Sequence, residues 1–159
     1  MTLLVVRHAP AGRRGSYKGD DRLRPLSPRG RTRALSLVPL LKQYRPKRIL
    51  SSPSVRCFQT VQPLAEYLGV PVETVDELAE GNGAAAIRLM QRMAGESAVL
   101  CTHGDVASEM LDVLVPDSAD AERSSFKLQK GEVWVVNSIG TTLAIVERIR
   151  RSDMGNVSA

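Results

Sequence analysis

The feature that most constrains the fold is a series of short apolar runs, each bounded by residues that break regular structure. The first run is followed by Arg-His and then by Ala-Pro-Ala-Gly, and three later runs have the same character. Apolar runs of this length with breakers behind them are typical of buried strands. The predicted strands are Thr2–Val6, Lys47–Ser51, Val70–Val75 and Ser97–Thr102.

Stretches with helical periodicity lie between these runs. Ser27-Pro28 and Ser52-Pro53 each give an N-cap serine followed by proline at the first helical position, and Gly69 is a suitable helix end. Pro39 falls inside the first of these helices, where we expect it to kink the helix or weaken one turn. Two further amphipathic segments lie at Gly83–Ala94 and Asp105–Leu114. Strands that alternate with helices predict parallel β-α units, whose sheet is covered on both faces.

The last part of the chain has a different pattern. Residues 116–130 are polar, and we expect a loop there. Gly131–Val136 and Thr142–Ile149 are strand-like and are joined by residues 137–140, which predicts a β-hairpin. We therefore predict an α/β fold: one three-layer domain over residues 1–150, with a mainly parallel sheet flanked by helices and a C-terminal hairpin. Residues 151–159 are expected to be a frayed tail.

The composition is that of a globular domain. The chain has 159 residues, of which 43% are hydrophobic and 25% are charged. No apolar run approaches the roughly 18–20 residues needed to cross a bilayer. The first residues lack a basic leader, and two cysteines cannot form a disulfide framework. We therefore expect a cytoplasmic protein that does not associate with membranes.

The net charge of +5 is concentrated near the N-terminus. Residues 7–33 carry nine Lys or Arg and two Asp, whereas the rest of the chain carries 13 basic and 15 acidic residues. Proteins that bind nucleic acids usually interleave aromatic side chains for stacking on the bases, and Tyr17 is the single aromatic residue in this stretch. The pattern therefore favours a small phosphate-type ligand and disfavours nucleic acid.

Both histidines of the chain follow predicted strands. His8 follows the first strand and His103 the last of the four, so both are expected at the carboxyl edge of the sheet, where α/β folds bind ligands. Arg7 adjoins His8, and Arg56 falls in the first turn of a predicted helix at the same edge. Alone, each has an ordinary alternative: a hydrogen-bonded structural histidine or a solvated arginine. Their coincidence at one edge predicts an anion site.

Other kinds of site are less well supported. Two histidines flanked by arginines would repel a divalent cation, and no Cys-x-x-Cys pair is present, so no metal and no cofactor are expected. Cys57 and Cys101 are interpreted as buried apolar fillers. Ser51 and Ser52 follow a strand, but no Gly-x-Ser-x-Gly motif surrounds them.

Three sequence blocks together resemble the histidine phosphatase superfamily, which has the phosphoglycerate mutase-like fold. The blocks are Arg7-His8-Ala9, residues 51–60 and Thr102-His103-Gly104. The Arg-His-Ala form, the segment 20–27 and the short chain resemble the SixA-type phosphohistidine phosphatases. They also resemble the phosphatase halves that some actinobacterial proteins fuse to a Nudix domain, whose own helix signature is absent here.

The resemblance implies a role for each matching residue. His8 would be the nucleophile that forms a phosphohistidine intermediate, and Arg7, Arg56 and His103 would surround the phosphoryl oxygens together with Gly104. A general acid is expected in many members of the family. Its pattern of Leu, any residue and Glu matches Leu78-Ala79-Glu80, so Glu80 is preferred and Glu77 is second. The alternative for Glu80 is a solvated surface carboxylate.

The resemblance implies a metal-independent phosphohydrolase acting through His8. The preferred substrate is phosphohistidine on a protein, and the alternative is a small phosphate ester or nucleotide. An alternative of another class is a non-catalytic module that binds an anion in this pocket without hydrolysing a substrate. In each case phosphate or sulfate is expected to bind in the site. The basic segment from Arg13 to Arg33 is interpreted as partly bordering the pocket and recruiting an anionic partner; alternatively, Arg29, Arg31 and Arg33 only solvate the first helix.

Overall fold

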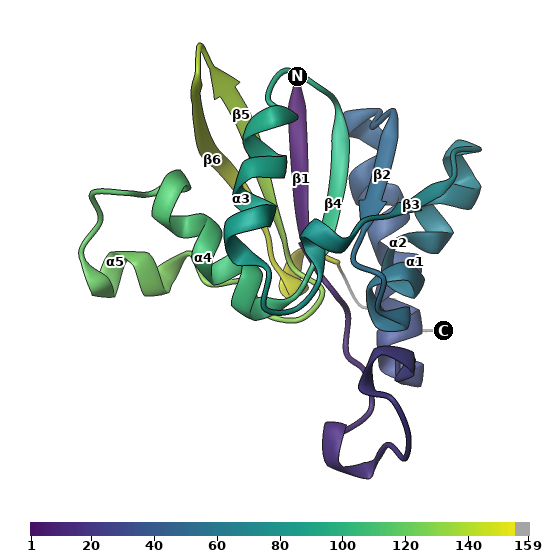
Figure 1. The fold of residues 1–159 in the computed structure, drawn as a ribbon. Coiled ribbons are helices and arrows are strands. Elements are labelled where there is room, and N and C mark those ends of the chain that lie inside the picture. The colour runs from purple at the N-terminus through teal and green to yellow at the C-terminus, as the bar shows by residue number, and fades with distance from the viewer. Residues whose placement is uncertain (155–159) are drawn as a thin grey trace.

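The computed structural model describes residues 1–154, which are built around one six-stranded sheet (Figure 1). The strands are β1 (Thr2–Arg7), β2 (Arg48–Ser51), β3 (Val72–Thr74), β4 (Ala98–Thr102), β5 (Val133–Ile139) and β6 (Thr142–Ile149). They are ordered β3-β2-β4-β1-β5-β6. The first four are parallel to one another, whereas β5 pairs antiparallel with β1 and β6 pairs antiparallel with β5.

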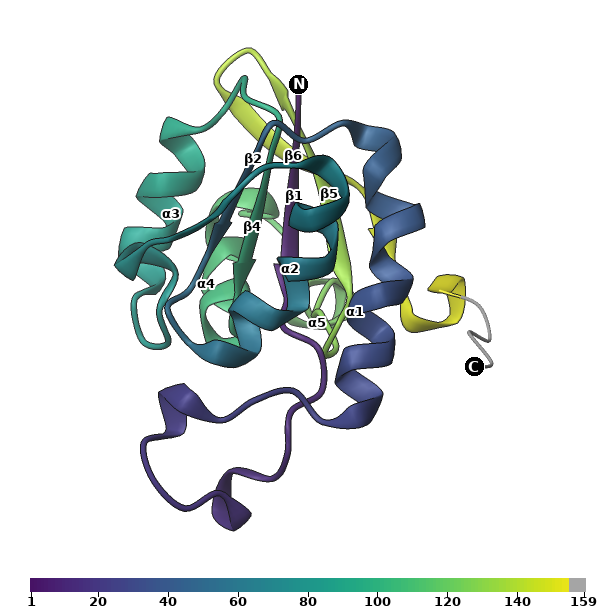
Figure 2. The same cartoon turned by 90° about the vertical axis from the view of Figure 1, so that its right-hand side faces the viewer.

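Helices cover both faces of this sheet (Figure 2). One face packs against α1 (Pro28–Leu41) and α2 (Val55–Leu68), and the other against α3 (Gly83–Arg92) and α4 (Gly104–Leu114). The helix α5 (Asp120–Ser125) has no buried residue. Short 3-10 turns complete the order: η1 (Arg14–Ser16), η2 (Asp21–Leu23), η3 (Lys42–Tyr44), η4 (Asp76–Leu78) and η5 (Arg151–Met154). Within residues 1–154, no helix has the length and apolar character needed to cross a membrane.

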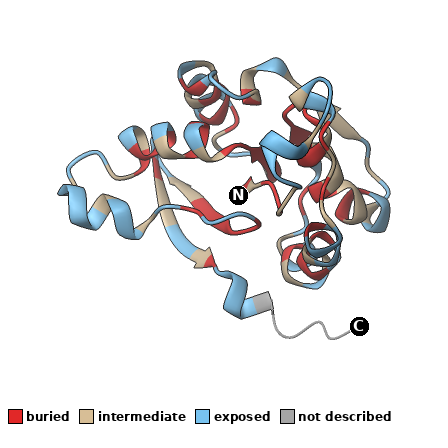
Figure 3. Cartoon of the chain, turned by 90° about the horizontal axis from the view of Figure 1, so that it is seen from below, coloured by how far each residue is buried: buried red, intermediate tan, exposed pale blue. Residues whose placement is uncertain are grey.

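The central strand β1 contributes to the core on both sides. Leu3 and Val5 contact the cluster beneath α3 and α4, whereas Leu4 and Val6 contact the cluster beneath α1 and α2. This division follows from the two-residue period of a strand, which points successive side chains to opposite faces. Buried residues accordingly gather on the sheet and on the helix sides that face it (Figure 3). The continuous apolar run of β1 is therefore explained by burial on both faces.

The predicted fold class is confirmed, but three local predictions were wrong, two of them about helices. The helix α2 starts at Val55 with Ser54 as its N-cap, and not at Ser52-Pro53. The Ser52 hydroxyl is instead hydrogen-bonded to the side chain of His103, at 2.8 Å. Residues 116–130 are not entirely a loop, because α5 forms within them. Acidic residues in its first turn, which favour a helix N-terminus, are the signal that the sequence offered.

The hairpin is present, but its turn lies later than predicted. β5 extends to Ile139, and the chain reverses at Gly140, whose φ of 63° is in the left-handed region that glycine adopts readily. Asn137 was predicted to belong to the connection between the two strands. It lies on the strand instead, where its side-chain oxygen accepts a hydrogen bond from Thr2. The predicted tail begins with the η5 turn, and residues 155–159 lie outside the described residues.

Candidate active site

The parallel pairing of β1 with β4 brings the two histidines together. Arg7 is in register with Thr102, so His8 and His103 leave the sheet side by side at its carboxyl edge. The His8 N–H donates to the Thr102 carbonyl at 3.0 Å, which continues the pairing by one residue. The ring centroids are 5.5 Å apart, and the residues are 6% and 2% exposed.

The His8 ring is held in one tautomer. Its Nδ1 lies 2.8 Å from the carbonyl oxygen of Ala9. Because a carbonyl only accepts hydrogen bonds, Nδ1 carries the proton, and Nε2 keeps its lone pair. Burial, together with the nearby His103, Arg56 and Arg7, lowers the pKa of His8 to about 3. The imidazole is therefore neutral near pH 7 and can act as a nucleophile through Nε2.

A buried hydroxyl fixes the backbone beside this ring. Thr60 Oγ1 accepts a hydrogen bond from the Ala9 N–H at 2.9 Å and donates to the carbonyl of Arg56 at 2.7 Å. It thereby connects the end of β1 to the first turn of α2. The position of His8 relative to Arg56 is set by this bridge.

Arg7 lies against the start of α4. Its Nη1 donates to the Leu128 carbonyl at 2.8 Å, while its buried Nε has no hydrogen-bond partner among the described residues. A Cβ at Gly104 would lie only 2.7 Å from Arg7 Cζ, so glycine is needed there for the guanidinium to approach. Because a buried N–H is rarely left unpaired, this Nε–H and the place of Arg7 in the cavity lining indicate a side chain that can bind an anion.

Arg56 is the most deeply buried charge of the site, at 1% exposure. Its Nη1 donates to the Asp21 carbonyl at 2.9 Å, and its Nη2 lies 3.3 Å from the Asp21 carboxylate and 3.4 Å from Glu80 Oε2. Arg56 Nε, like that of Arg7, has no partner among the described residues. These contacts hold the guanidinium in place next to the cavity, whose lining does not include Arg56 itself.

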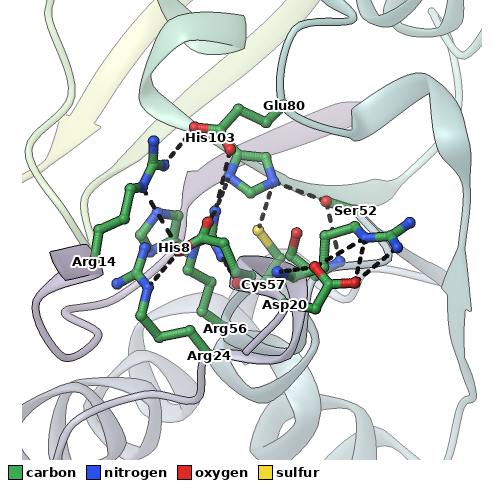
Figure 4. A network of polar contacts seen from close by, with 12 residues as sticks. His8, Arg14, Asp20, Arg24, Ser52, Arg56, Cys57, Glu80 and His103 are labelled. Atoms are coloured by element: carbon green, nitrogen blue, oxygen red, sulfur yellow. Dashed lines mark hydrogen bonds and ion pairs between the residues drawn. The ribbon is translucent and has the colours of Figure 1, made fainter. Parts of the chain in front are cut away.

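His103 is oriented by contacts on both ring nitrogens (Figure 4). Arg56 Nη2 lies 3.4 Å from Nδ1, and Ser52 Oγ lies 2.8 Å from Nε2. A guanidinium only donates, so in this arrangement Nδ1 accepts and the Nε2–H donates to Ser52. Cys57 Sγ also lies 3.6 Å from Nε2, so this cysteine contacts the site and is more than an apolar filler.

Glu80 lines the cavity that contains His8 and His103, and its carboxylate is paired with two arginines. Its Oε1 is 2.7 Å from Arg14 Nη2, and its Oε2 is the atom that contacts Arg56. A proton delivered from either oxygen would compete with one of these ion pairs. Glu77 belongs to the η4 turn and does not line the cavity described here.

The cavity extends well beyond the two histidines. Its volume is about 530 Å³, and it is lined by six cationic side chains and two carboxylates as well as by His8 and His103. Part of the basic segment lines it, through Arg13, Arg14 and Arg24. That part belongs to the excursion between β1 and α1, which projects beyond the carboxyl edge of the sheet (Figure 2). Arg31 and Arg33 do not line it; Arg33 instead donates to the carbonyl of Lys130.

Several residues of the site were missed in the sequence. Ser52 and Thr60 lay within a block already singled out, and their hydroxyls orient His103 and the His8 backbone. Lys127 and Lys130 also line the cavity, but they come from a segment that gave no sequence signal beyond its polarity. In the part of the chain that the structure describes, no three His, Cys, Asp or Glu side chains gather where they could hold a metal ion.

Comparison with known proteins identifies the family. The model of the histidine phosphatase superfamily (branch 1) matches residues 3–85, a span that contains Arg7, His8, Arg56 and Glu80. The chain belongs to the histidine phosphatase superfamily. The predicted resemblance to this superfamily is thus confirmed.

Individual relatives of this superfamily differ in what they act on. The 8-oxo-(d)GTP phosphatase of Mycolicibacterium smegmatis is 38% identical over 143 residues, which cover 86% of this chain and 44% of that protein. The chain therefore spans less than half the length of this relative. A SixA structure from Agrobacterium tumefaciens has a TM-score of 0.76 at 20% identity and covers 93% of this chain and 97% of its own. The structure of the protein histidine phosphatase SixA complexed with tungstate has a TM-score of 0.74 at 20% identity. The match covers 94% of this chain and 97% of the SixA chain.

Proposed function

We propose that the protein is a metal-independent phosphohydrolase that works through a phosphohistidine intermediate on His8. The observation that carries this proposal is the neutral His8 ring with a free Nε2, placed beside Arg7 and Arg56, whose buried Nε–H groups have no hydrogen-bond partner among the described residues. Such donors fit the oxygens of a phosphoryl group. A SixA relative complexed with tungstate, a phosphate-like anion, supports the same type of ligand.

The proposed chemistry follows from this arrangement. His8 Nε2 attacks phosphorus, a P–N bond forms, and the bond to the leaving group breaks with its electron pair going to that group. Arg7 and Arg56 donate hydrogen bonds to the phosphoryl oxygens, and His103 borders the same space. Fixed cations supply the positioning and charge stabilisation that phosphoryl transfer requires. Water then attacks phosphorus, the P–N bond breaks, and phosphate leaves.

The surroundings of Glu80 favour substrates whose leaving group needs little protonation. Both carboxylate oxygens contact arginines, so this group is poorly placed to deliver a proton to a departing alkoxide. Phosphohistidine on a protein satisfies this condition, because its leaving group is the imidazole of the histidine side chain. We therefore keep it as a substrate class, together with the SixA-like fold that supports it.

A nucleotide is the second substrate class, and a specific observation favours it. The relative with 38% identity is named an 8-oxo-(d)GTP phosphatase. A phosphoanhydride of a nucleotide also satisfies the condition above, because its leaving group is a phosphate. Simple phosphate esters, which leave as alkoxides, are expected to be poorer substrates.

A substrate panel tests the proposal. A phosphohistidine protein, nucleoside di- and triphosphates and sugar phosphates would be incubated with the protein, with and without chelator. We expect turnover of one of the first two classes, no loss with chelator, and no turnover by His8→Ala. Phosphate binding without turnover of any substrate would indicate an anion-binding module, and inhibition by chelator that one divalent ion reverses would contradict metal independence.

A further inference from the structure

The cavity wall carries two lysines that the chemistry at His8 does not use. Lys127 and Lys130 line the cavity, and neither forms an ion pair with a carboxylate in residues 1–154. Burial, and then the charges of arginines headed by Arg7 and Arg24, lower the pKa of the Lys130 ammonium from its usual value. These cations repel one another, and the repulsion is relieved when an anion binds between them.

The segment that carries these lysines is fixed directly to the catalytic strand. The N–H of Gly131 donates to the carbonyls of Arg7 and His8 at 3.0 Å each, and Arg7 Nη1 donates to the carbonyl of Leu128. Gly131 has a φ of +81°, in the left-handed region that favours glycine, so the turn that makes these hydrogen bonds depends on a glycine at this position. The backbone that bears the two lysines is therefore held in place relative to His8 before any ligand binds.

The balance of charge around the cavity exceeds what one phosphoryl group needs. Arg7 and Arg56 already provide the buried donors for that group. The cavity wall adds Arg13, Arg14, Arg24, Lys127 and Lys130, against only Glu80 and Asp105. Glu80 is engaged by Arg14 and Arg56, and Asp105 accepts the N–H of Gly81 at 2.9 Å. Asp21 does not line the cavity, but its carboxylate pairs with Arg14 and Arg24. The five cations that the wall adds still outnumber these three carboxylates.

We propose that Lys127 and Lys130 form a second anion site, which binds the phosphate next to the one that His8 attacks, so that the substrate is a nucleotide phosphoanhydride such as a nucleoside diphosphate. This inference rests on the function proposed above and selects between its two substrate classes. A volume of about 530 Å³ is within the range of roughly 300–1,000 Å³ that pockets for small organic ligands occupy.

The proposed reaction is balanced without a further reactant. Nε2 of His8 bonds to the terminal phosphorus, and the bond from that phosphorus to the bridging oxygen breaks. The bridging oxygen keeps the electron pair and leaves as a phosphate oxygen of the shortened nucleotide, held by the lysines. Water then cleaves the P–N bond, so the products are inorganic phosphate and the shortened nucleotide, and the proton from water passes to solvent.

A double substitution tests the second site against a matched control. Lys127→Gln with Lys130→Gln removes two charges at the cavity. Lys42→Gln with Lys47→Gln removes the same charge near the opposite, amino edge of the sheet, where β2 begins. GDP and the free amino acid phosphohistidine are the two substrates. Inorganic pyrophosphate and phosphate are the two competing inhibitors.

The second site predicts a selective loss. The cavity variant should lower kcat/KM for GDP roughly tenfold or more, because a hydrogen bond to a charged group is lost. Its kcat/KM for phosphohistidine should stay within about threefold of wild type, because phosphohistidine has no second phosphate for the lysines to bind. Wild type should bind pyrophosphate more tightly than phosphate, and the variant should lose this preference. The control variant should change none of these values.

Three outcomes would overturn the second site: equal losses for both substrates, losses no larger than those of the control, or no preference for pyrophosphate in wild type. Failure of the proposed function looks different. In that case neither substrate would place phosphate on His8. A phosphorylated His8 together with the absence of any selective loss would overturn the second anion site alone.

Discussion

Replacing Ser52 by alanine tests how His103 is held. The hydroxyl is fully buried, lies 2.8 Å from His103 Nε2 and accepts the N–H of Ser54 at 3.3 Å. Ser52→Ala therefore leaves the buried N–H of Ser54 without this acceptor and leaves His103 Nε2 with only the weak contact to Cys57 Sγ at 3.6 Å. Each such loss costs about 1–3 kcal/mol. The two losses together predict a decrease of about 2–6 kcal/mol in the free energy of unfolding.

The effect on activity should exceed the effect on the amount of folded protein. Without the Ser52 hydroxyl, the His103 ring is no longer fixed in the tautomer whose Nδ1 lone pair faces Arg56 Nη2. A loss of about 1.5–3 kcal/mol in transition-state stabilisation would lower kcat roughly 10- to 150-fold. Steady-state kinetics at a temperature where the variant is folded measure this loss. Nitrogen NMR shifts of the His103 ring report the tautomer independently of activity.

Ser54→Ala is the matched control for this substitution. Ser54 is also buried, at 4% exposure, and precedes the same helix, but its hydroxyl makes no capping hydrogen bond. The same chemical change two residues away should therefore leave kcat and the His103 tautomer close to wild type. Equal effects of Ser52→Ala and Ser54→Ala on kcat, or an unchanged tautomer in Ser52→Ala, would refute the positioning role of Ser52.

Three further predictions concern the charged groups of the site. Arg56→Lys keeps the charge but loses the fork that spans Asp21 and Glu80, so kcat/KM should fall roughly 10- to 150-fold, and unchanged kinetics would exclude a role for this geometry. Glu80→Gln should slow phosphomonoester and phosphohistidine hydrolysis to a similar degree, because Glu80 anchors Arg14 and Arg56; an additional loss of about 10²–10⁴-fold for the ester alone would instead identify it as the general acid. The pKa of His8 is about 3 in the folded protein and near 6.5 in an unfolded chain, so only the unfolded state gains its proton as pH falls between these values, and stability decreases. Over that range the free energy of unfolding of wild type, measured in denaturant titrations, should fall by up to about 1.4 kcal/mol per pH unit more than that of His8→Ala. Parallel pH profiles of the two proteins would contradict the burial of a neutral His8.

The sequence predicted the fold and the main cluster of the site because both depend on short-range patterns. Apolar runs ended by breakers identify the parallel strands, and the register of such strands places residues that follow them at one edge. His8 and His103 were found in this way. Arg56 was found because a helix start after β2 lies at the same edge.

The residues that the sequence did not predict reach the site through long-range contacts. Lys127 and Lys130 approach it because Arg7 binds the carbonyl of Leu128, a contact between residues 121 positions apart. Ser52 was interpreted as a helix cap, since Ser-Pro is a local helix-start signal, whereas its partner His103 is 51 residues away. No periodicity or local motif encodes such pairings, so only the three-dimensional structure reveals them.

The most direct measurement for the central claim is the detection of phosphate on His8 during turnover. Wild type would be mixed with radiolabelled GDP or phosphohistidine protein, quenched in alkali within milliseconds, and digested for mass spectrometry. We expect alkali-stable, acid-labile phosphate on the peptide that contains His8, formed and lost at rates compatible with kcat, and none in His8→Ala. Full turnover without any phosphate on His8, or turnover retained by His8→Ala, would contradict the account.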